Sequence, residues 1–433
     1  MSSAEFGAFS LPLLALLFGA VLLGDLFTRL RQPRVAGEIL AGVLLGPSVI
    51  GLVVPAWGSG IFDSGGPSAN RVVIGFLYNL GLLLLMFASG TETRGMFRRE
   101  DRREVAWLCV MGTVLPFVLA LVVTAFLPLD GVAGPANHRI SLVLVIGIAF
   151  AVTSIPVIAR IFHDLHILHT RFARLVLAVA VLEDIVLWGI LAVATALAAA
   201  AALPAGAVAA RTAAALVFFA VGLTVLPPLV SALTRAPWNV FARDTPVAYL
   251  VAVLFAYTAL AAALEVNLAF AAFLGGYALV RDDLLTDART ALNRVSFAVF
   301  IPIYFAVVGY QLDVTRRFSF AIATFVLVAA CVVKLLSAGL GARLAGFPWR
   351  DSVNLSIVLN ARGGPGIVLA SVAYDAKIVS GEFYTALVIL AVLTSQAAGA
   401  WLDYVLRKGW PLLTEAAEPV VHPGVSLEAE SAT

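Results

Sequence analysis

The chain has 433 residues, of which 61% are hydrophobic and 12% are charged, whereas an ordinary soluble domain is about 45–50% apolar and about 25% charged. With half of the usual charge the chain could not form an ordinary water-facing surface, which excludes a soluble enzyme, a nucleic-acid binder and a disordered protein. The formal net charge of +2 decides little, because the positions of the Lys and Arg residues matter more than their sum.

Thirteen apolar runs follow one another along the chain, most of them near the roughly 20 residues that a helix needs to cross a bilayer. Because lipid offers no hydrogen bonds to the backbone, such runs must be helical. The predicted spans are 9–30, 35–53, 70–92, 103–127, 139–162, 170–201, 211–232, 246–263, 266–281, 293–312, 319–345, 350–374 and 382–408. The alternating pattern of a membrane β-barrel is absent from the sequence. We therefore predict an all-α polytopic membrane protein with thirteen transmembrane helices.

The basic residues predict how this bundle sits in the membrane, because cytoplasmic loops are rich in Lys and Arg. Twenty of them fall in one set of alternate loops, beginning with Arg29, Arg31 and Arg34, and six fall in the other set. The remaining two, Lys334 and Arg362, lie within predicted spans. This asymmetry favours an odd number of crossings in the plasma (inner) membrane, with the N-terminus outside and the C-terminus in the cytoplasm.

No soluble domain is apparent, so we expect any function to lie in the membrane region, residues 1–408. Residues 409–433 are acidic and poor in apolar types, which predicts a short disordered cytoplasmic tail. The two cysteines, Cys109 and Cys331, lie inside apolar runs, and no group of Cys and His has metal-ligand spacing. We therefore expect no bound cofactor.

Ionisable side chains at membrane depth are candidates for function, because each costs about 2.5–3.5 kcal/mol on insertion scales. Glu183 and Asp184 are adjacent midway along an apolar run. Neighbours on a helix point about 100° apart, so one carboxylate can face a cavity while the other faces a neighbouring helix. The alternative is a helix end at the interface, with both carboxylates in water.

Lys334 is the only lysine inside a predicted span. A carboxylate partner would keep a buried ammonium charged, whereas a lysine near an interface would extend its head group to water instead. The first interpretation pairs Lys334 with one of the two buried carboxylates.

Two predicted helices are interrupted. Thr153-Ser154-Ile155-Pro156 breaks the fifth, since proline lacks an amide hydrogen and disfavours helix before it, and the segment 360–366, Asn-Ala-Arg-Gly-Gly-Pro-Gly, breaks the twelfth. Irregular backbone persists at membrane depth only where it lines a cavity or is buried in protein. The freed carbonyls and the Thr153 and Ser154 hydroxyls suit a small hard cation; a simple proline kink is the alternative.

The two breaks are seven helices apart, and an odd offset reverses direction across the membrane. This predicts inverted repeats, in which helices 1–6 mirror helices 8–13, with 211–232 as a linker. Inverted repeats with broken helices at the midplane are typical of secondary transporters. Arg362 could then balance the carbonyl end of a half-helix, whose partial charge is negative, or could serve packing alone.

With these features in this order, the sequence resembles the monovalent cation:proton antiporters, and more closely the Kef-like second branch with its Na⁺/H⁺ exchanger domain. The resemblance covers about residues 1–410. It rests on the carboxylate pair and on the segments Gly37–Ser48, Thr153–Ala159, Phe270–Gly276, Pro302–Gly309 and Asn360–Gly363.

The resemblance implies a two-part fold and a homodimer. The mobile core would comprise about residues 103–201 and 319–408, and the dimerisation or panel helices would comprise about residues 9–92 and 246–312. It also implies that Asp184 carries cation and proton in turn and that Glu183 pairs with Lys334. Glu-Asp departs from the Asp-Asp common in electrogenic members, the Asn-Asp of electroneutral ones and the Gln-Asp of Kef-type potassium proteins.

Residues and resemblance together predict a secondary active transporter that exchanges Na⁺ or K⁺ for protons by alternating access. Ionised Asp184 would bind the cation with Thr153, Ser154 and freed carbonyls, and protonation would expel it. The rivals are a K⁺-selective Kef-type efflux antiporter, an intramembrane acid–base enzyme and a non-transporting scaffold. Adjacent carboxylates on one helix diverge, which disfavours the enzyme, and costly buried charges disfavour the scaffold.

Overall fold

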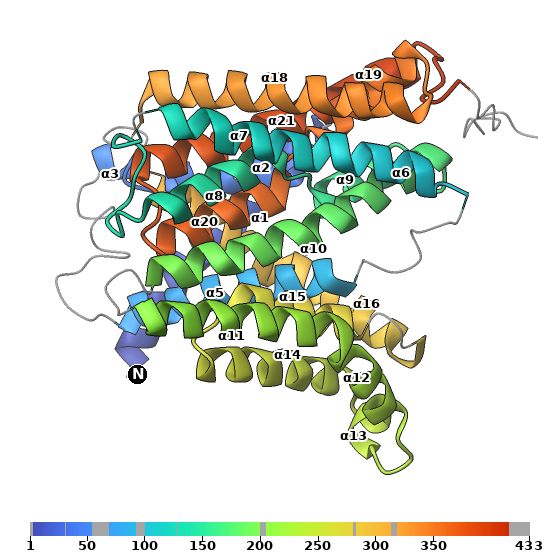
Figure 1. Cartoon of the computed structure of the whole chain (residues 1–433). Coiled ribbons are helices and arrows are strands. Elements are labelled where there is room, and N and C mark those ends of the chain that lie inside the picture. Colours follow the sequence, from blue (N-terminus) through green and yellow to red (C-terminus); the bar gives the residue numbers. More distant parts are fainter. Residues whose placement is uncertain are drawn as a thin grey trace, which may run out of the picture.

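The structure, a computed structural model, describes residues 3–30, 32–53, 69–91, 100–127, 129–199, 205–279, 283–312 and 318–414. In these residues every regular element is helical, and the only β-type pairing is an isolated bridge between Ala133 and Val379. Most of the helices run side by side in Figure 1, with α18 along one edge of the bundle and α14 near the other. The all-α architecture predicted from the sequence is confirmed.

The first half of the chain forms α1 (Ser3–Arg29), α2 (Arg34–Leu45), α3 (Ile50–Val53), α5 (Ala69–Thr91), α6 (Arg102–Cys109), the π-helix η1 (Val110–Val114), α7 (Leu115–Phe126), α8 (Arg139–Ala151), α9 (Ile155–Asp164) and α10 (Arg171–Ala199). The second half forms α11 (Ala205–Thr224), α12 (Leu226–Arg235), α13 (Val240–Asp244), α14 (Pro246–Ala263), α15 (Leu268–Ala278), the 3₁₀ turn η2 (Asp283–Leu285), α16 (Thr286–Val295), the π-helix η3 (Ser296–Phe300), α17 (Ile301–Gln311), α18 (Phe320–Ala345), α19 (Trp349–Leu359), α20 (Gly363–Asp375) and α21 (Gly381–Arg407).

Each predicted apolar run contains helix, but the number thirteen is not confirmed. Among the described residues, nine helical segments are long and apolar enough to span a membrane, and a tenth results if α11 and α12, bent by 47°, are counted as one span. In the predicted spans 35–53, 139–162 and 266–281 the longest helices have only 12, 13 and 11 residues, and the first two spans are each divided into two helices. A polytopic membrane protein follows, with several spans built from short or broken helices.

Glycines bring two pairs of helices into backbone contact. A Cβ on Gly42 of α2 would lie 1.8 Å from the carbonyl oxygen of Ala306 in α17, and one on Gly309 of α17 would lie 2.0 Å from that of Ile39 in α2. The same reciprocal arrangement joins α5 and α15 through Gly90 and Gly276, against the carbonyls of Phe273 and Phe87. Small residues that allow such approach are a general means of packing helices in lipid. They hold the predicted panel helices together.

Two loops pair at one end of the predicted core. The amides of Gly134 and Ala136, between α7 and α8, donate to the carbonyls of Ile378 and Lys377, between α20 and α21, each at 2.9 Å. The Ser380 amide returns a bond of 2.9 Å to the carbonyl of Val132. These bonds tie α8 to α20, the helices that carry the two predicted breaks.

The chain beyond α21 is anchored for a further seven residues, up to Thr414. The Thr414 amide and hydroxyl donate to the Asp351 carboxylate of α19 at 2.8 and 2.7 Å, and the Asn354 amide nitrogen donates to the Leu412 carbonyl at 3.1 Å. Leu412 and Leu413 are buried. Residues 409–414 therefore differ from the disorder predicted for 409–433, and residues 415–433 lie outside the described part.

Candidate functional site

The two broken helices meet at their breaks. The first break, residues 152–154, separates α8 from α9, and the second, residues 360–362, separates α19 from α20. The Ser154 amide donates to the Ala361 carbonyl at 2.8 Å, and the Thr153 hydroxyl donates to the Leu359 carbonyl at 2.7 Å. Simple proline kinks would not need these contacts, in which donors of the first break meet carbonyls of the second. The first break instead supplies donors to two carbonyls at the second, in a buried crossing.

Gly363 begins α20 with φ +38°, which falls in the left-handed region. A Cβ there would lie 2.6 Å from the Ser154 hydroxyl oxygen and 2.5 Å from a Val157 methyl group. The Arg362 and Gly363 amides donate to the hydroxyls of Thr394 and Ser395 in α21, at 3.2 and 3.0 Å. Glycine is required here by both backbone angle and space, and α21 caps the start of α20.

Arg362 lies at the carbonyl end of α8. Its Nε donates to the Ala149 carbonyl at 2.8 Å and its Nη2 to the Phe150 carbonyl at 3.2 Å. Further bonds run to the Ala330 carbonyl in α18 at 3.0 Å and to the Asn360 side chain at 2.7 Å. The residue is only 1% exposed, and its guanidinium is bonded to α8, to α18 and to the second break.

Lys334 of α18 binds the next carbonyl of the same helix end. Its Nζ donates to the Ala151 carbonyl, to the Gly112 carbonyl at 2.7 Å and to Glu183 Oε1 at 2.9 Å. The side chains of Lys334 and Glu183 are both 0% exposed. A lysine extended toward an interface is therefore excluded, and the ion pair lies inside the bundle.

Glu183 and Asp184 lie near the middle of α10, at 1% and 0% exposure, which excludes a solvated helix end. Glu183 Oε1 accepts a second bond, of 2.5 Å, from the Thr113 hydroxyl. Its Oε2 is buried with no hydrogen-bond partner among the described residues. Helix α10 packs against both α8 and α9, so both carboxylates belong to the helix that lies beside the first break.

Thr153 and Ser154, the predicted hydroxyl ligands, are fully buried at the crossing. The Thr153 hydroxyl donates to the Leu359 carbonyl, and the Ser154 hydroxyl oxygen accepts from the Val157 amide at 3.4 Å. Both oxygens keep lone pairs after these bonds. The structure thus gives each predicted hydroxyl a defined orientation.

Sequence reasoning missed several polar residues of this region. Thr113 and the Gly112 carbonyl contact the ion pair, and Thr394 and Ser395 cap α20. In the sequence, the only sign of them is that they are polar residues inside predicted spans. This sign is weak, because a threonine or serine in a span can instead bond to the backbone of its own helix. Which of them faces the site depends on packing between distant segments.

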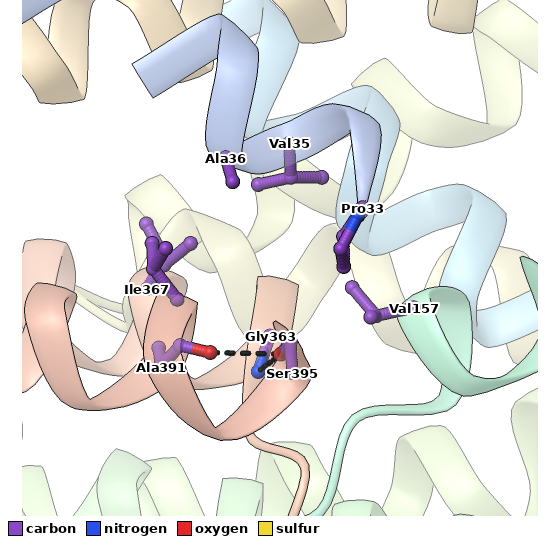
Figure 2. Close-up of a pocket in the computed structure, with 9 residues that line it drawn as sticks. Pro33, Val35, Ala36, Val157, Gly363, Ile367, Ala391 and Ser395 are labelled. Carbon is purple, nitrogen blue, oxygen red and sulfur yellow. Dashed lines mark hydrogen bonds between the residues drawn. The ribbon is translucent and has the colours of Figure 1, made fainter. Parts of the chain in front are cut away.

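A very small pocket lies beside the start of α20, with only about 10 Å³ of space for water. Figure 2 shows Gly363 and Ser395 on one side of it, Val157 of α9 beside them, and Pro33 and Ala36 at the start of α2 opposite. The pocket therefore lies between the start of a predicted panel helix and the second break.

At the other end of α20, tyrosines join the predicted panel to the predicted core. Tyr78 of α5 donates to the Asp375 carboxylate at 3.3 Å, and Tyr304 of α17 bonds to the Ser371 hydroxyl at 3.3 Å. Tyr384 of α21 reaches back to a carbonyl of α17, that of Val308, at 3.5 Å. We call the residues Tyr78, Tyr304, Tyr384, Ser371 and Asp375 the tyrosine cluster. Its tyrosine rings are buried, whereas Asp375 is exposed.

Comparison with known proteins gives a consistent result. The family model "Sodium/hydrogen exchanger, transmembrane" matches residues 13–408. The Na⁺/H⁺ antiporter NhaS4 of Synechocystis is 26% identical over 395 residues, which cover 87% of this chain and 92% of that protein. The K⁺/H⁺ antiporter 1 of Saccharomyces cerevisiae is 27% identical over 387 residues, covering 85% and 43%.

The chain spans about half the length of the first curated relatives that it matches. Among solved structures, the sodium proton antiporter MjNhaP1 of Methanocaldococcus jannaschii superimposes with a TM-score of 0.62, over 94% of this chain and 98% of that one. At 13% identity this likeness shows the fold alone, and it agrees with the antiporter fold predicted from the sequence.

Proposed function

Because the chain belongs to the transmembrane sodium/hydrogen exchanger family, we propose that it exchanges a monovalent cation, Na⁺ or K⁺, for protons, with Asp184 binding the cation or the proton in turn. The family consists of transporters, which sets aside the intramembrane acid–base enzyme. The observation that carries the proposal is a wholly buried carboxylate, Asp184, next to an ion pair and beside crossed broken helices.

The pairing of Glu183 with Lys334 assigns different roles to the two carboxylates. Glu183 and Lys334 balance each other's charge at 2.9 Å inside the bundle. Asp184 follows on the same helix and is equally buried. An ionised carboxylate at this depth is expensive, and binding either a cation or a proton lowers that cost. The two ligands thus compete for one group, which is sufficient for exchange.

The crossing supports a cation site nearby. The carbonyl end of a helix carries a partial negative charge, and Arg362 and Lys334 already occupy the carbonyl end of α8. A transported cation therefore need not bind there. Thr153 and Ser154 at the first break, with Asp184, are the oxygen ligands that we assign to it, as hard monovalent cations prefer oxygen.

Alternating access is supported by the difference between the two ends of α20. The pocket of Figure 2 lies at the start of this helix, between α2 and the crossing. The tyrosine cluster lies at its end and bonds α5 and α17 to α20 and α21. We assign to this structure a state in which the tyrosine-cluster end is closed. Movement of the core helices against the panel helices would open that end.

The cation is Na⁺ or K⁺. The printed names of relatives include both a Na⁺/H⁺ and a K⁺/H⁺ antiporter, so a K⁺-selective exchanger is the alternative within the same class. From the loop charges we also propose a location in the plasma membrane, with the N-terminus outside and the C-terminus cytoplasmic. A homodimer through the panel helices is part of the same proposal.

Purified protein in liposomes tests this function directly. Vesicles that enclose a pH-sensitive dye are given an outward or inward gradient of Na⁺, K⁺ or Li⁺ across a range of pH. Proton movement that depends on one of these cations, and that reverses with its gradient, is expected. If none of the three cations drives proton movement, the proposed exchange activity is excluded.

A further inference from the structure

One turn of the helix that faces Glu183 is a π-helix. It spans Val110–Val114 between α6 and α7, and its closing bond runs from the Leu115 amide to the Val110 carbonyl, five residues back. An α-helix would close over four residues. The extra residue in the turn loosens the regular ladder, and single π-turns of this kind often occur at functional sites.

Two consecutive residues of this turn contact the buried ion pair. The Gly112 carbonyl accepts a bond of 2.7 Å from Lys334 Nζ, and the Thr113 hydroxyl donates a bond of 2.5 Å to Glu183 Oε1. The same oxygen accepts from Lys334 at 2.9 Å. One turn therefore supplies an acceptor to the cation and a donor to the carboxylate.

The hydrogen bond from Thr113 restricts the orientation of the Glu183 carboxylate. Glutamate has one more rotatable bond than aspartate, and Glu183 Oε2 has no hydrogen-bond partner among the described residues. Every hydrogen bond that the structure gives to this carboxylate is therefore made through Oε1. Without Thr113, Lys334 alone would orient the Glu183 carboxylate, next to the neighbouring carboxylate of Asp184.

We propose that the π-turn Val110–Val114 positions the Glu183–Lys334 ion pair, and that Thr113 is a positioning residue for cation exchange at Asp184. This inference rests on the proposed function and assigns no direct contact with the cation to Thr113. Its hydroxyl holds Glu183 on Lys334 and away from the cation, so that Asp184 alone exchanges ligands. The longer side chain at position 183 makes this tether necessary.

The test compares three threonine variants in the liposome assay. Thr113→Val keeps the shape and removes the donor, and we expect a loss of turnover of about tenfold, the scale of a charge-assisted hydrogen bond. Thr113→Ser restores the donor and keeps turnover within about twofold of the parent. The apparent KM for the cation should also change in Thr113→Val, because a released Glu183 carboxylate competes with Asp184.

Thr124→Val is the matched control. Thr124 lies in the same span and is 4% exposed. Among the described residues, its hydroxyl donates only to the carbonyls of Ala120 and Leu121 in its own helix, at 2.7 and 3.1 Å. The substitution Thr124→Val removes a buried hydroxyl from the same span and leaves the contacts of the ion pair unchanged. Turnover and KM should match the parent protein in this variant.

A purely structural role predicts a different pattern. Thr113→Val would then lower the melting temperature and the yield of folded protein, with KM unchanged in the protein that remains. Parental KM and turnover in Thr113→Val, or equal impairment in Thr113→Ser, would overturn the positioning role. If Thr113→Val does not fold, Thr113→Ala against Thr113→Ser makes the same comparison with no added volume.

Failure of this inference is distinguishable from failure of the proposed function. If the parent protein exchanges and Asp184→Asn does not, the function stands whatever Thr113→Val shows. The coupling between positions 113 and 183 gives a second readout: Thr113→Val should have less effect in a Glu183→Asp background, whose shorter carboxylate no longer reaches Thr113. Equal effects in both backgrounds would also count against the proposal.

Discussion

Arg362 and Lys334 share the carbonyl end of one half-helix. Arg362 donates to the carbonyls of Ala149 and Phe150, and Lys334 donates to that of Ala151. The carbonyls of the last three residues of α8 therefore all bond to cationic side chains. A half-helix end at membrane depth carries a partial negative charge and unsatisfied acceptors. The two cationic side chains, which come from two different elements, balance this partial charge and donate hydrogen bonds to these acceptors.

Loss of Arg362 should destabilise the core. Arg362→Gln leaves the carbonyls of Ala149 and Phe150 without their guanidinium donor, and each buried acceptor left unsatisfied costs about 1–3 kcal/mol. Arg362→Lys should not restore stability, because lysine lacks the planar fork of donors. Thermal unfolding in detergent measures the effect. Arg407→Gln, at a 60% exposed side chain paired with Asp403, should shift the melting temperature little, and an equal shift in both variants would contradict the account.

The Lys334–Glu183 pair should show strong coupling. Lys334→Gln alone buries an unpaired carboxylate, and Glu183→Gln alone buries an unpaired ammonium, each at a cost of about 3–5 kcal/mol. The double variant removes both charges and should be less destabilised than the sum of the two, by at least about 1 kcal/mol. Melting temperatures of the four proteins measure the coupling. Additive losses would mean that the two side chains do not interact as the structure shows.

The tyrosine cluster should control the opening of one end of α20. Tyr78→Phe removes the bond to Asp375 but keeps the ring, which packs 5.2 Å from that of Tyr304. Weakening the closed end should raise hydrogen–deuterium exchange in residues 363–386. Tyr249→Phe is the control, since Tyr249 is equally buried but bonds to Thr234, at 3.0 Å, away from the cluster. If hydrogen–deuterium exchange is unchanged in Tyr78→Phe, the tyrosine cluster does not control the opening of this end.

Backbone contact between α2 and α17 should not tolerate a single methyl group. Gly42→Ala places a Cβ 1.8 Å from the Ala306 carbonyl oxygen, so the helices must separate and we expect a loss of several kcal/mol, as for severe overpacking. Gly75→Ala in α5 meets no atom within 4 Å and should be neutral or stabilising by up to about 1 kcal/mol. The melting temperatures of the two variants decide between these outcomes.

Much of the fold and part of the candidate site followed from the sequence. Long apolar runs predicted helices, because lipid leaves the backbone no alternative. Glu183, Asp184 and Lys334 were identified as buried charges because few ionisable residues interrupt those runs. The short α2, α8 and α15 could not be distinguished from full spans, since apolar flanks extend the hydrophobic run beyond the helix.

The remainder depends on contacts between distant segments. The π-turn at Val110–Val114 leaves no periodic signal, because one added residue shifts the helix without altering its composition. Thr113 became visible only once α10 was placed beside this turn. Likewise Thr414 binds Asp351 across 63 positions of the chain, a pairing that the composition of the tail does not reveal.

The most direct test replaces Asp184 by asparagine and measures cation-dependent proton movement in liposomes. Asparagine keeps the size of the side chain but can neither lose a proton nor carry the charge that holds a cation. The account predicts that Asp184→Asn folds and shows no exchange with Na⁺, K⁺ or Li⁺, while the control Asp403→Asn, at a partly exposed carboxylate near the end of α21, exchanges like the parent. Retained exchange in Asp184→Asn would contradict the central role of this carboxylate.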